Sequence, residues 1–141
     1  MKMPIELKAL IESGCPAFLI TLNPDGSPQS TLVWIGIDGD DLVAAHLPKN
    51  QKVKNILRDS RVAVSLLANT KSEMNLTEYA VIYGTASITE GGAADLLQKL
   101  AEVYIGPGVK FPPMDNPPPG YITHIRVERI EGVGPWTGRS V

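Results

Sequence analysis

The chain has 141 residues, of which 43% are hydrophobic and 20% charged, the composition expected for one globular domain spanning residues 1–141. A net charge of −2 and a pI near 5.6 argue against a general nucleic-acid binder, which needs a basic surface. No apolar run approaches the length of a membrane span, and the only cysteine, Cys15, cannot form an intramolecular disulfide. We therefore expect a cytoplasmic protein that acts neither on nucleic acid nor in a membrane.

The first third of the chain predicts a helix and then strands joined by short turns. Pro4 suits the first turn of a helix, and Gly14 is a suitable stop. The apolar side of this helix is predicted to consist of Ile5, Leu7, Leu10 and Ile11. Strands are predicted at residues 17–22, 29–37 and 42–47, with turn-forming residues between them. Three strands joined by two short turns predict an antiparallel meander.

Residues 44–66 read as a strand, a basic loop, a short helix and another strand. Five basic residues lie in this stretch and only one acid, Asp59. They are Lys49, Lys52, Lys54, Arg58 and Arg61. A basic loop that leads into a helix N-terminus suits an anionic ligand, because free N–H groups and the helix dipole favour negative charge there.

The helix predicted at residues 52–57 has an apolar stripe formed by Val53, Ile56 and Leu57. Two residues flank this stripe and are expected to face a ligand, and two others point away from it toward water. The first pair is Lys52 and Asn55, and the second is Lys54 and Arg58. The alternative is an ordinary surface helix with a solvated charged face.

The rest of the chain predicts more strands and one further helix. Gly84, inside a long apolar strand, indicates a bulge or a close backbone approach. The predicted elements are strands at residues 61–68, 79–89 and 121–132, a polar loop at 69–78, a helix at 91–106 and a Pro/Gly-rich loop at 106–120. Strands of this length and apolar content favour closure into a barrel. The expected fold is mainly β, a barrel of six or so antiparallel strands with flanking helices.

Motifs typical of zinc sites, hydrolases and P-loops are absent from the sequence. The only two histidines, His46 and His124, are too few for a three-ligand metal site, so no metal is expected. If the protein is an enzyme, we therefore expect a cofactor to supply the chemistry.

Three stretches of the chain could build a cofactor site. In residues 28–34, Gln29 and Thr31 share one face of a strand, and in residues 46–52, Asn50 or Gln51 could cap a helix. The third stretch, residues 133–136, ends in Trp136. Each has an ordinary structural alternative. Gln29 and Thr31 could simply face solvent, His46 could be a structural histidine, and Trp136 could fill the core or anchor a dimer.

The order of these segments resembles the pyridoxamine 5'-phosphate oxidase-like split β-barrels, an FMN-binding-like fold whose members bind flavin or deazaflavin. The matching pieces are FLITLNPDGSPQSTLVW, LPKNQKVKNILRDSRVAVSL, YAVIYGTASIT and RVERIEGVGPW. The pattern KxxNxxRDxRV, which begins at Lys52, and the terminal GPW most resemble the branch that uses coenzyme F420.

The resemblance implies a homodimer with two cofactor sites at the subunit interface. The segment along the ring system would comprise Pro28, Gln29, Ser30 and Thr31. The segment that holds the ribityl-phosphate chain would comprise His46, Leu47, Pro48, Lys49, Gln51, Lys52 and Asn55. The partner subunit would contribute Met74, Tyr79 and Trp136. Lys52 is the expected charge partner, and Gln51 stands where several relatives carry an arginine.

The function that this resemblance implies is hydride transfer between reduced coenzyme F420 and a small conjugated molecule such as an enone, a quinone or a tetrapyrrole. No side chain is assigned as catalytic, because the transfer itself requires no protein acid or base. The alternatives are an FMN-dependent oxidoreductase of the same fold, a non-catalytic deazaflavin carrier, and a structural homodimer whose groove binds nothing.

Overall fold

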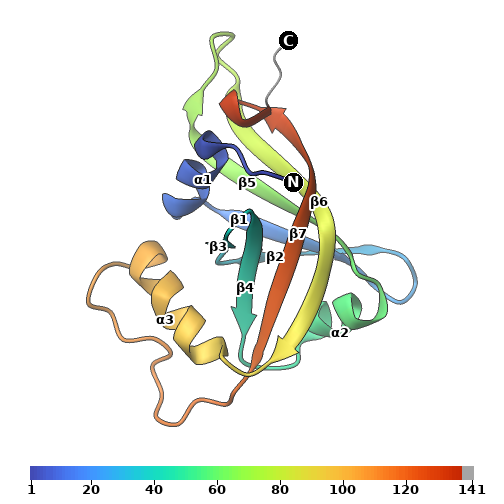
Figure 1. Cartoon of the computed structure of the whole chain (residues 1–141), viewed down its shortest axis with the longest axis vertical. Helices are drawn as coiled ribbons and strands as arrows, with labels where there is room; N and C mark the ends of the chain where they lie inside the picture. Colours follow the sequence, from blue (N-terminus) through green and yellow to red (C-terminus); the bar gives the residue numbers. More distant parts are fainter. Residues whose placement is uncertain (138–141) are drawn as a thin grey trace.

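The computed structural model describes residues 1–137, and its fold is mainly β (Figure 1). Three α-helices and a short 3₁₀ helix accompany one seven-stranded antiparallel sheet of order β2-β1-β5-β6-β7-β4-β3. The elements are α1 (Ile5–Glu12), β1 (Ala17–Leu22), β2 (Pro28–Val33), β3 (Gly36–Asp38), β4 (Asp41–His46), α2 (Gln51–Arg58), β5 (Arg61–Lys71), β6 (Thr77–Glu90), α3 (Ala93–Tyr104), β7 (Tyr121–Val133) and η1 (Pro135–Thr137). Within the described residues, no helix has both the length and the apolar character needed to cross a membrane.

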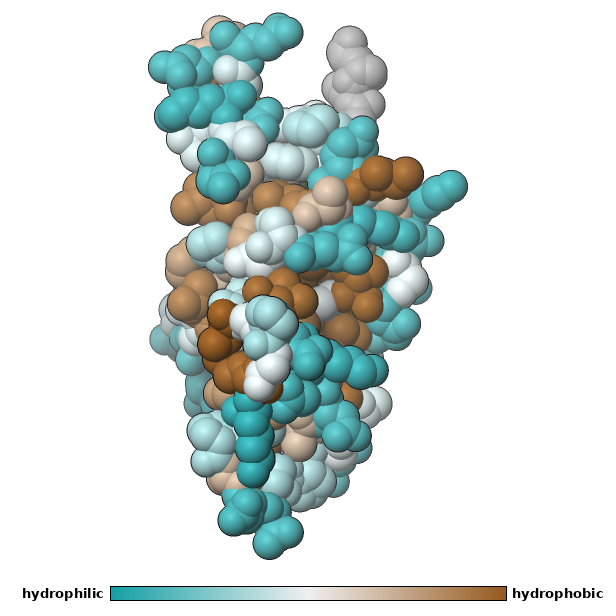
Figure 2. All heavy atoms as spheres, turned by 90° about the vertical axis from the view of Figure 1, so that its left-hand side faces the viewer, coloured by the Kyte–Doolittle hydropathy of each residue, from teal (hydrophilic) through white to brown (hydrophobic). Residues whose placement is uncertain are grey.

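The sheet wraps around one hydrophobic core. In Figure 1, β1 and β2 run across the direction of β4, β6 and β7, so the sheet curves instead of lying flat. The core draws on every strand except β3 and also on α1, α2 and η1; its largest fully buried side chains include Leu7, Leu19, Leu66, Ile82 and Ile125. Figure 2 shows hydrophobic surface across the middle of the α1 and α3 side, and hydrophilic residues at the tip of the β5–β6 hairpin.

The strand predicted at residues 29–37 is broken into two strands in the structure, so the predicted meander is wrong. Within the described residues, the first part of this predicted strand, β2, pairs only with β1, whereas the last part, β3, pairs only with β4. Trp34 and Ile35 lie between the two parts and are not in a strand. Because β4 pairs with β7, the two halves of the predicted strand lie at opposite ends of the sheet.

Gly84 confirms the expected irregularity of the long strand β6. The register between β6 and β7 shifts between Tyr83 and Gly84. A Cβ atom added at Gly84 would overlap the carbonyl oxygen of Arg126, so only glycine fits this close approach. The polar loop predicted at 69–78 is shorter than expected, because β5 extends to Lys71 and β6 begins at Thr77.

Helix α1 covers the core with a narrower face than predicted. Leu7 and Ile11 are fully buried, but the side chain of Ile5 is 80% exposed. Side chains two residues apart on a helix are rotated by roughly 200° about its axis, so Ile5 lies on the side opposite Leu7. The prediction that Ile5 belongs to the apolar side is therefore wrong.

Candidate functional site

Lys52, in the first turn of α2, carries a half-buried ammonium group next to strand β2. Its Nζ donates a hydrogen bond to Thr31 Oγ1 at 3.3 Å, and burial lowers the pKa of Lys52 below its ordinary value. Among residues 1–137, no carboxylate forms a salt bridge with it. The ammonium is thus partly desolvated without a counter-ion, an arrangement that an anionic ligand would stabilise.

The loop before α2 brings a second cation and a helix N-terminus to the same place. Asn50, one of the two predicted caps, caps the helix, because its Oδ1 accepts a hydrogen bond from the N–H of Val53 at 3.3 Å. The adjacent Lys49 is exposed. The half-buried Leu47 and the exposed Pro48 complete the loop. This segment therefore combines positive charge with the N–H groups that favour anions.

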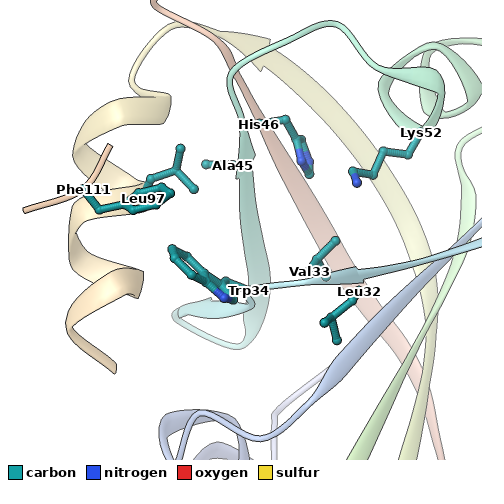
Figure 3. A pocket seen from close by; sticks show the side chains of 8 residues that line it. All are labelled: Leu32, Val33, Trp34, Ala45, His46, Lys52, Leu97 and Phe111. Atoms are coloured by element: carbon teal, nitrogen blue, oxygen red, sulfur yellow. The ribbon is translucent and has the colours of Figure 1, made fainter. Parts of the chain in front are cut away.

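His46 ends β4 and is buried, with 6% of its surface exposed. Its Nε2 lies 2.9 Å from Thr123 Oγ1 on the neighbouring strand β7, within hydrogen-bond distance. Burial and the charge of Lys52 lower the pKa of His46 from 6.5 to about 4, so the ring is neutral near pH 7. His46 therefore has the structural role that its alternative interpretation predicted, and together with Lys52 it lines one side of a cavity (Figure 3).

Asn55 does not face a ligand, and this prediction is corrected. Its side chain is fully buried. Its Nδ2 donates hydrogen bonds to Thr21 Oγ1 at 3.0 Å and to Asn23 Oδ1 at 2.9 Å. Its Oδ1 accepts hydrogen bonds from Gln51 Nε2 at 2.8 Å and from Arg58 Nη1 at 3.3 Å. With both polar atoms occupied inside the protein, Asn55 ties α2 to β1 and the turn after it.

The buried face of α2 is rotated relative to the predicted stripe. Val53 and Ile56 are buried as expected, but Leu57 is 56% exposed. The polar network of Asn55 holds the helix with that residue inward, and the rotation turns Leu57 outward. Lys54 is exposed as predicted. Arg58 is also exposed, although its guanidinium donates to the carbonyl oxygen of Leu22.

Strand β2 presents two predicted site residues inward and two outward. Gln29 and Thr31 are half-buried, whereas Pro28 and Ser30 are exposed. The Thr21 hydroxyl donates to Gln29 Oε1 at 3.4 Å, and Thr31 accepts from Lys52. Because β2 is an edge strand of the sheet, its outer backbone N–H and C=O groups have no strand partner. Such an edge can form hydrogen bonds with a flat heterocyclic ring.

A cavity of about 250 Å³ lies between the end of β2, β4, α2 and α3 (Figure 3). Its lining residues are Leu32, Val33, Trp34, Ala45, His46, Lys52, Leu97 and Phe111. In Figure 3, Lys52 and His46 lie on one side, and Trp34, Leu97 and Phe111 lie on the other. The cavity is therefore cationic at one end and aromatic at the other.

The aromatic end of this cavity contains residues that were not predicted as site residues. Trp34 belongs to a stretch that was predicted to build a cofactor site, but only polar residues of that stretch and Pro28 were predicted to contact the cofactor. Leu97 was expected as part of a helix stripe, and Phe111 lies in the Pro-rich loop. These residues come together only in the folded chain, so no local pattern could have identified them.

The residues expected to reach a partner subunit do not line this cavity in the chain's own fold. Met74 is 81% exposed on the β5–β6 hairpin, and Tyr79 is 42% exposed near the start of β6. Trp136, however, is 5% exposed and belongs to the core. Its Nε1 donates to the carbonyl oxygen of Tyr79 at 2.9 Å. The core-filling alternative is confirmed, and the prediction that Trp136 contacts a cofactor in another subunit is corrected.

A larger cavity of about 610 Å³ lies between α3 and the sheet, and its lining contains acidic as well as basic side chains. His124 Nε2 lies 3.6 Å from Asp38 Oδ2 and 3.7 Å from Asp41 Oδ2. Lys99 and Asp95 supply one further charge of each sign. In the described part of the chain, no group of three His, Cys, Asp or Glu side chains is placed to hold a metal ion. The Lys52 cavity, with its uncompensated cation, is therefore the stronger candidate site.

Comparison with known proteins agrees with this assignment of the fold. A model of the family described as pyridoxamine 5'-phosphate oxidase matches residues 3–134. A solved structure named F420 reductase is 27% identical, with a TM-score of 0.71, over 88% of this chain and 94% of that one. No curated protein matches the chain.

Two further solved structures share the fold. A conserved hypothetical protein from Mycobacterium tuberculosis is 23% identical with a TM-score of 0.72, over 94% of this chain and 84% of that one. HupZ from Group A Streptococcus is 20% identical with a TM-score of 0.66, over 98% of this chain and 99% of that one. At these identities the likeness establishes the fold, and it confirms the barrel expected from the sequence.

Proposed function

Because the chain belongs to the pyridoxamine 5'-phosphate oxidase family, whose members are oxidoreductases with flavin-type cofactors, we propose that it is an oxidoreductase dependent on coenzyme F420. Its substrate would be a small conjugated molecule that accepts hydride. FMN is the alternative cofactor, since the family as a whole uses flavins. Similarity to the structure named F420 reductase supports the first choice.

The observation that carries this proposal is the uncompensated ammonium of Lys52. F420 and FMN both combine a flat ring with a phosphate-bearing chain. The half-buried Lys52, the exposed Lys49 and the N-terminus of α2 suit the phosphate, because each favours negative charge. These groups lie in one segment next to strand β2, so one ligand can contact all of them.

Strand β2 is the proposed support for the ring. Its outer backbone groups at Pro28–Val33 can form hydrogen bonds with the ring edge, and the half-buried Thr31 lies between that edge and Lys52. When bound, the reduced cofactor supplies a hydride to an acceptor in contact with its ring. The chain's own residues would orient the two partners and exclude water between them.

A second copy of the chain is proposed to complete the site. A cavity of about 250 Å³ is smaller than the roughly 300–1,000 Å³ typical of ligand sites, so one protomer holds only part of the cofactor. Four exposed apolar side chains share one outer sheet face, because Phe18 is paired with Leu32 and Leu67 with Tyr79 on adjacent strands. Leu32 also lines the cavity. A copy seated on this face would therefore adjoin the ligand, and its exposed Met74 is available to contact it.

Light scattering after size-exclusion chromatography tests the proposed dimer. We expect a dimer for the unmodified protein and a monomer for Phe18→Glu, because a charge on the apolar face opposes association. If the monomeric variant also binds the cofactor less tightly, the second copy contributes to the site. A monomeric wild type would contradict this part of the proposal.

Titration of the purified protein with F420 and with FMN tests the cofactor assignment. Tighter binding of F420 supports the proposal, and micromolar FMN binding without F420 binding would transfer it to FMN. If neither binds, the redox function is rejected. Reduced F420 mixed with electron-poor acceptors then separates an enzyme from a carrier, since a pure carrier would give no steady turnover.

A further inference from the structure

Three aromatic side chains are packed together at the end of the cavity opposite Lys52. Trp34 stacks on Tyr104, with ring centroids 5.6 Å apart and an angle of 12° between the planes. Phe111 packs against Trp34 at 5.0 Å with a tilt of 58°. Trp34 and Phe111 line the cavity together with Leu97. This end has no charged lining residue, in contrast to the end formed by Lys52 and His46.

Tyr104 holds Trp34 in its position at the break between β2 and β3. The Tyr104 hydroxyl accepts a hydrogen bond from the backbone N–H of Ile35 at 3.2 Å. This N–H follows Trp34 directly and lies outside any strand, so the hydroxyl supplies a partner in place of a strand. The stacked ring and the hydrogen bond together fix both the side chain and the backbone at Trp34.

Gln98 of α3 holds Phe111 in an analogous way. Its Nε2 donates to the carbonyl oxygen of Val109 at 2.7 Å, and its Oε1 accepts from the N–H of Phe111 at 2.9 Å. The amide thus binds the backbone of the Pro-rich loop on both sides of Lys110. Side chains fixed in this manner form a preformed binding surface, not one that must be ordered by the ligand.

We propose that Trp34 and Phe111 form the wall that selects the hydride acceptor, and that they favour an uncharged, planar conjugated molecule. The inference rests on the proposed function, in which the cationic end receives the anionic chain of the cofactor. Aromatic faces favour flat π-systems. Gln98 acts as a positioning residue for Phe111.

Reduction of the acceptor balances with the reduced cofactor that is already proposed. The acceptor gains a hydride from the reduced cofactor and a proton from water, so a quinone becomes a hydroquinone. The cofactor loses two electrons with the hydride and releases one proton to water, which balances the proton that the acceptor takes up. No other oxidant or reductant is required.

A binding experiment without cofactor tests the location of the site. Menadione, a flat two-ring quinone, serves as the probe. Trp34 lines the cavity, whereas the other tryptophan, Trp136, is buried in the core. We expect saturable quenching of tryptophan fluorescence in the wild type and no saturable quenching in Trp34→Phe. Equal quenching in the variant would overturn the proposal, because the probe would then bind near Trp136 or elsewhere.

A kinetic experiment tests the selectivity of the wall. With the bound cofactor in its reduced form, Phe111→Ala is expected to raise the KM for menadione roughly fivefold and to leave the KM for cyclohexenone, a non-aromatic enone, within about twofold. Met114→Ala, an exposed residue of the same loop, is the matched control and should change neither KM. If Phe111→Ala changes both acceptors equally, the wall does not select planar rings.

Variants of Gln98 separate positioning from general stability. Gln98→Met removes both hydrogen bonds to the loop, whereas Gln98→Glu keeps an acceptor for the Phe111 N–H. We expect the menadione KM to rise in Gln98→Met with kcat unchanged, and to be restored in large part in Gln98→Glu. Equal effects of the two variants, or a loss of kcat alone, would overturn the positioning role.

Failure of the redox function can be distinguished from failure of this inference. If neither F420 nor FMN binds, the proposed function fails, and menadione quenching with its loss in Trp34→Phe still decides whether the aromatic site exists. If the cofactor binds and is reoxidised while the Phe111 and Trp34 variants behave as wild type, the inference alone fails.

Discussion

The two ends of the cavity are built by different means. The cationic end depends on residues close together in the chain, since Lys49, Asn50 and Lys52 lie within one loop and one helical turn. The aromatic end joins Trp34 to Tyr104 and Phe111, which are some seventy positions further along the chain. Buried polar hydrogen bonds support the first end, and ring packing supports the second. The site therefore combines a locally encoded anion-binding segment with a surface that exists only after folding.

The largest effect is expected from the polar network beneath the cationic end. Asn55→Ala removes four hydrogen bonds, including the one that the buried Thr21 hydroxyl accepts. We expect a loss of about 3–4 kcal/mol in the free energy of unfolding, measured by urea denaturation. Gln51→Ala, which removes one hydrogen bond of an exposed residue, is the matched control and should cost less than about 1 kcal/mol. Similar values for both would contradict the central position of Asn55.

A pH effect of comparable size is expected from His46, which borders the same end. Its pKa is lowered from 6.5 to about 4 by burial and by Lys52, so the unfolded chain binds more protons than the folded one between these values. Stability is therefore complete above about pH 6.5 and falls by up to about 3 kcal/mol as the pH drops toward 4. His46→Gln should flatten this part of a profile of unfolding free energy against pH. An unchanged slope would show that other groups cause it.

A smaller effect is expected at the aromatic end. Tyr104→Phe keeps the stack on Trp34 but removes the acceptor for the Ile35 N–H. We expect a loss of about 1 kcal/mol in the free energy of unfolding and a higher KM for planar acceptors, with cofactor affinity unchanged. A loss of cofactor affinity in Tyr104→Phe would contradict the division of the cavity into two independent ends.

The difference between the two ends of the cavity also explains which features could be predicted from the sequence. The order of strands and helices, the Asn50 cap, the shared face of Gln29 and Thr31 and the irregularity at Gly84 all depend on local patterns, and each is found in the structure. These patterns record turn chemistry and alternation within a few residues.

The errors arise where distant residues override a local pattern. Hydrophobicity alone places Leu57 inward on α2, but the hydrogen bonds of Asn55 to β1 and the following turn hold the opposite side in. The stretch at 29–37 predicts one continuous strand, yet Tyr104 binds the backbone after Trp34 and the chain changes partners there. Trp136 and Phe111 could not be assigned, because their neighbours lie more than ten residues away in sequence.

The central claim is that Lys52 binds the phosphate of a flavin-type cofactor, and the most direct measurement compares ligands with and without that phosphate. FMN and riboflavin, or F420 and its phosphate-free chromophore, should be titrated against wild type, Lys52→Met and Lys54→Met. We expect wild type and Lys54→Met to bind the phosphate form at least about tenfold more tightly than the phosphate-free form, and we expect Lys52→Met to abolish this preference. A preference that persists in Lys52→Met would contradict the account.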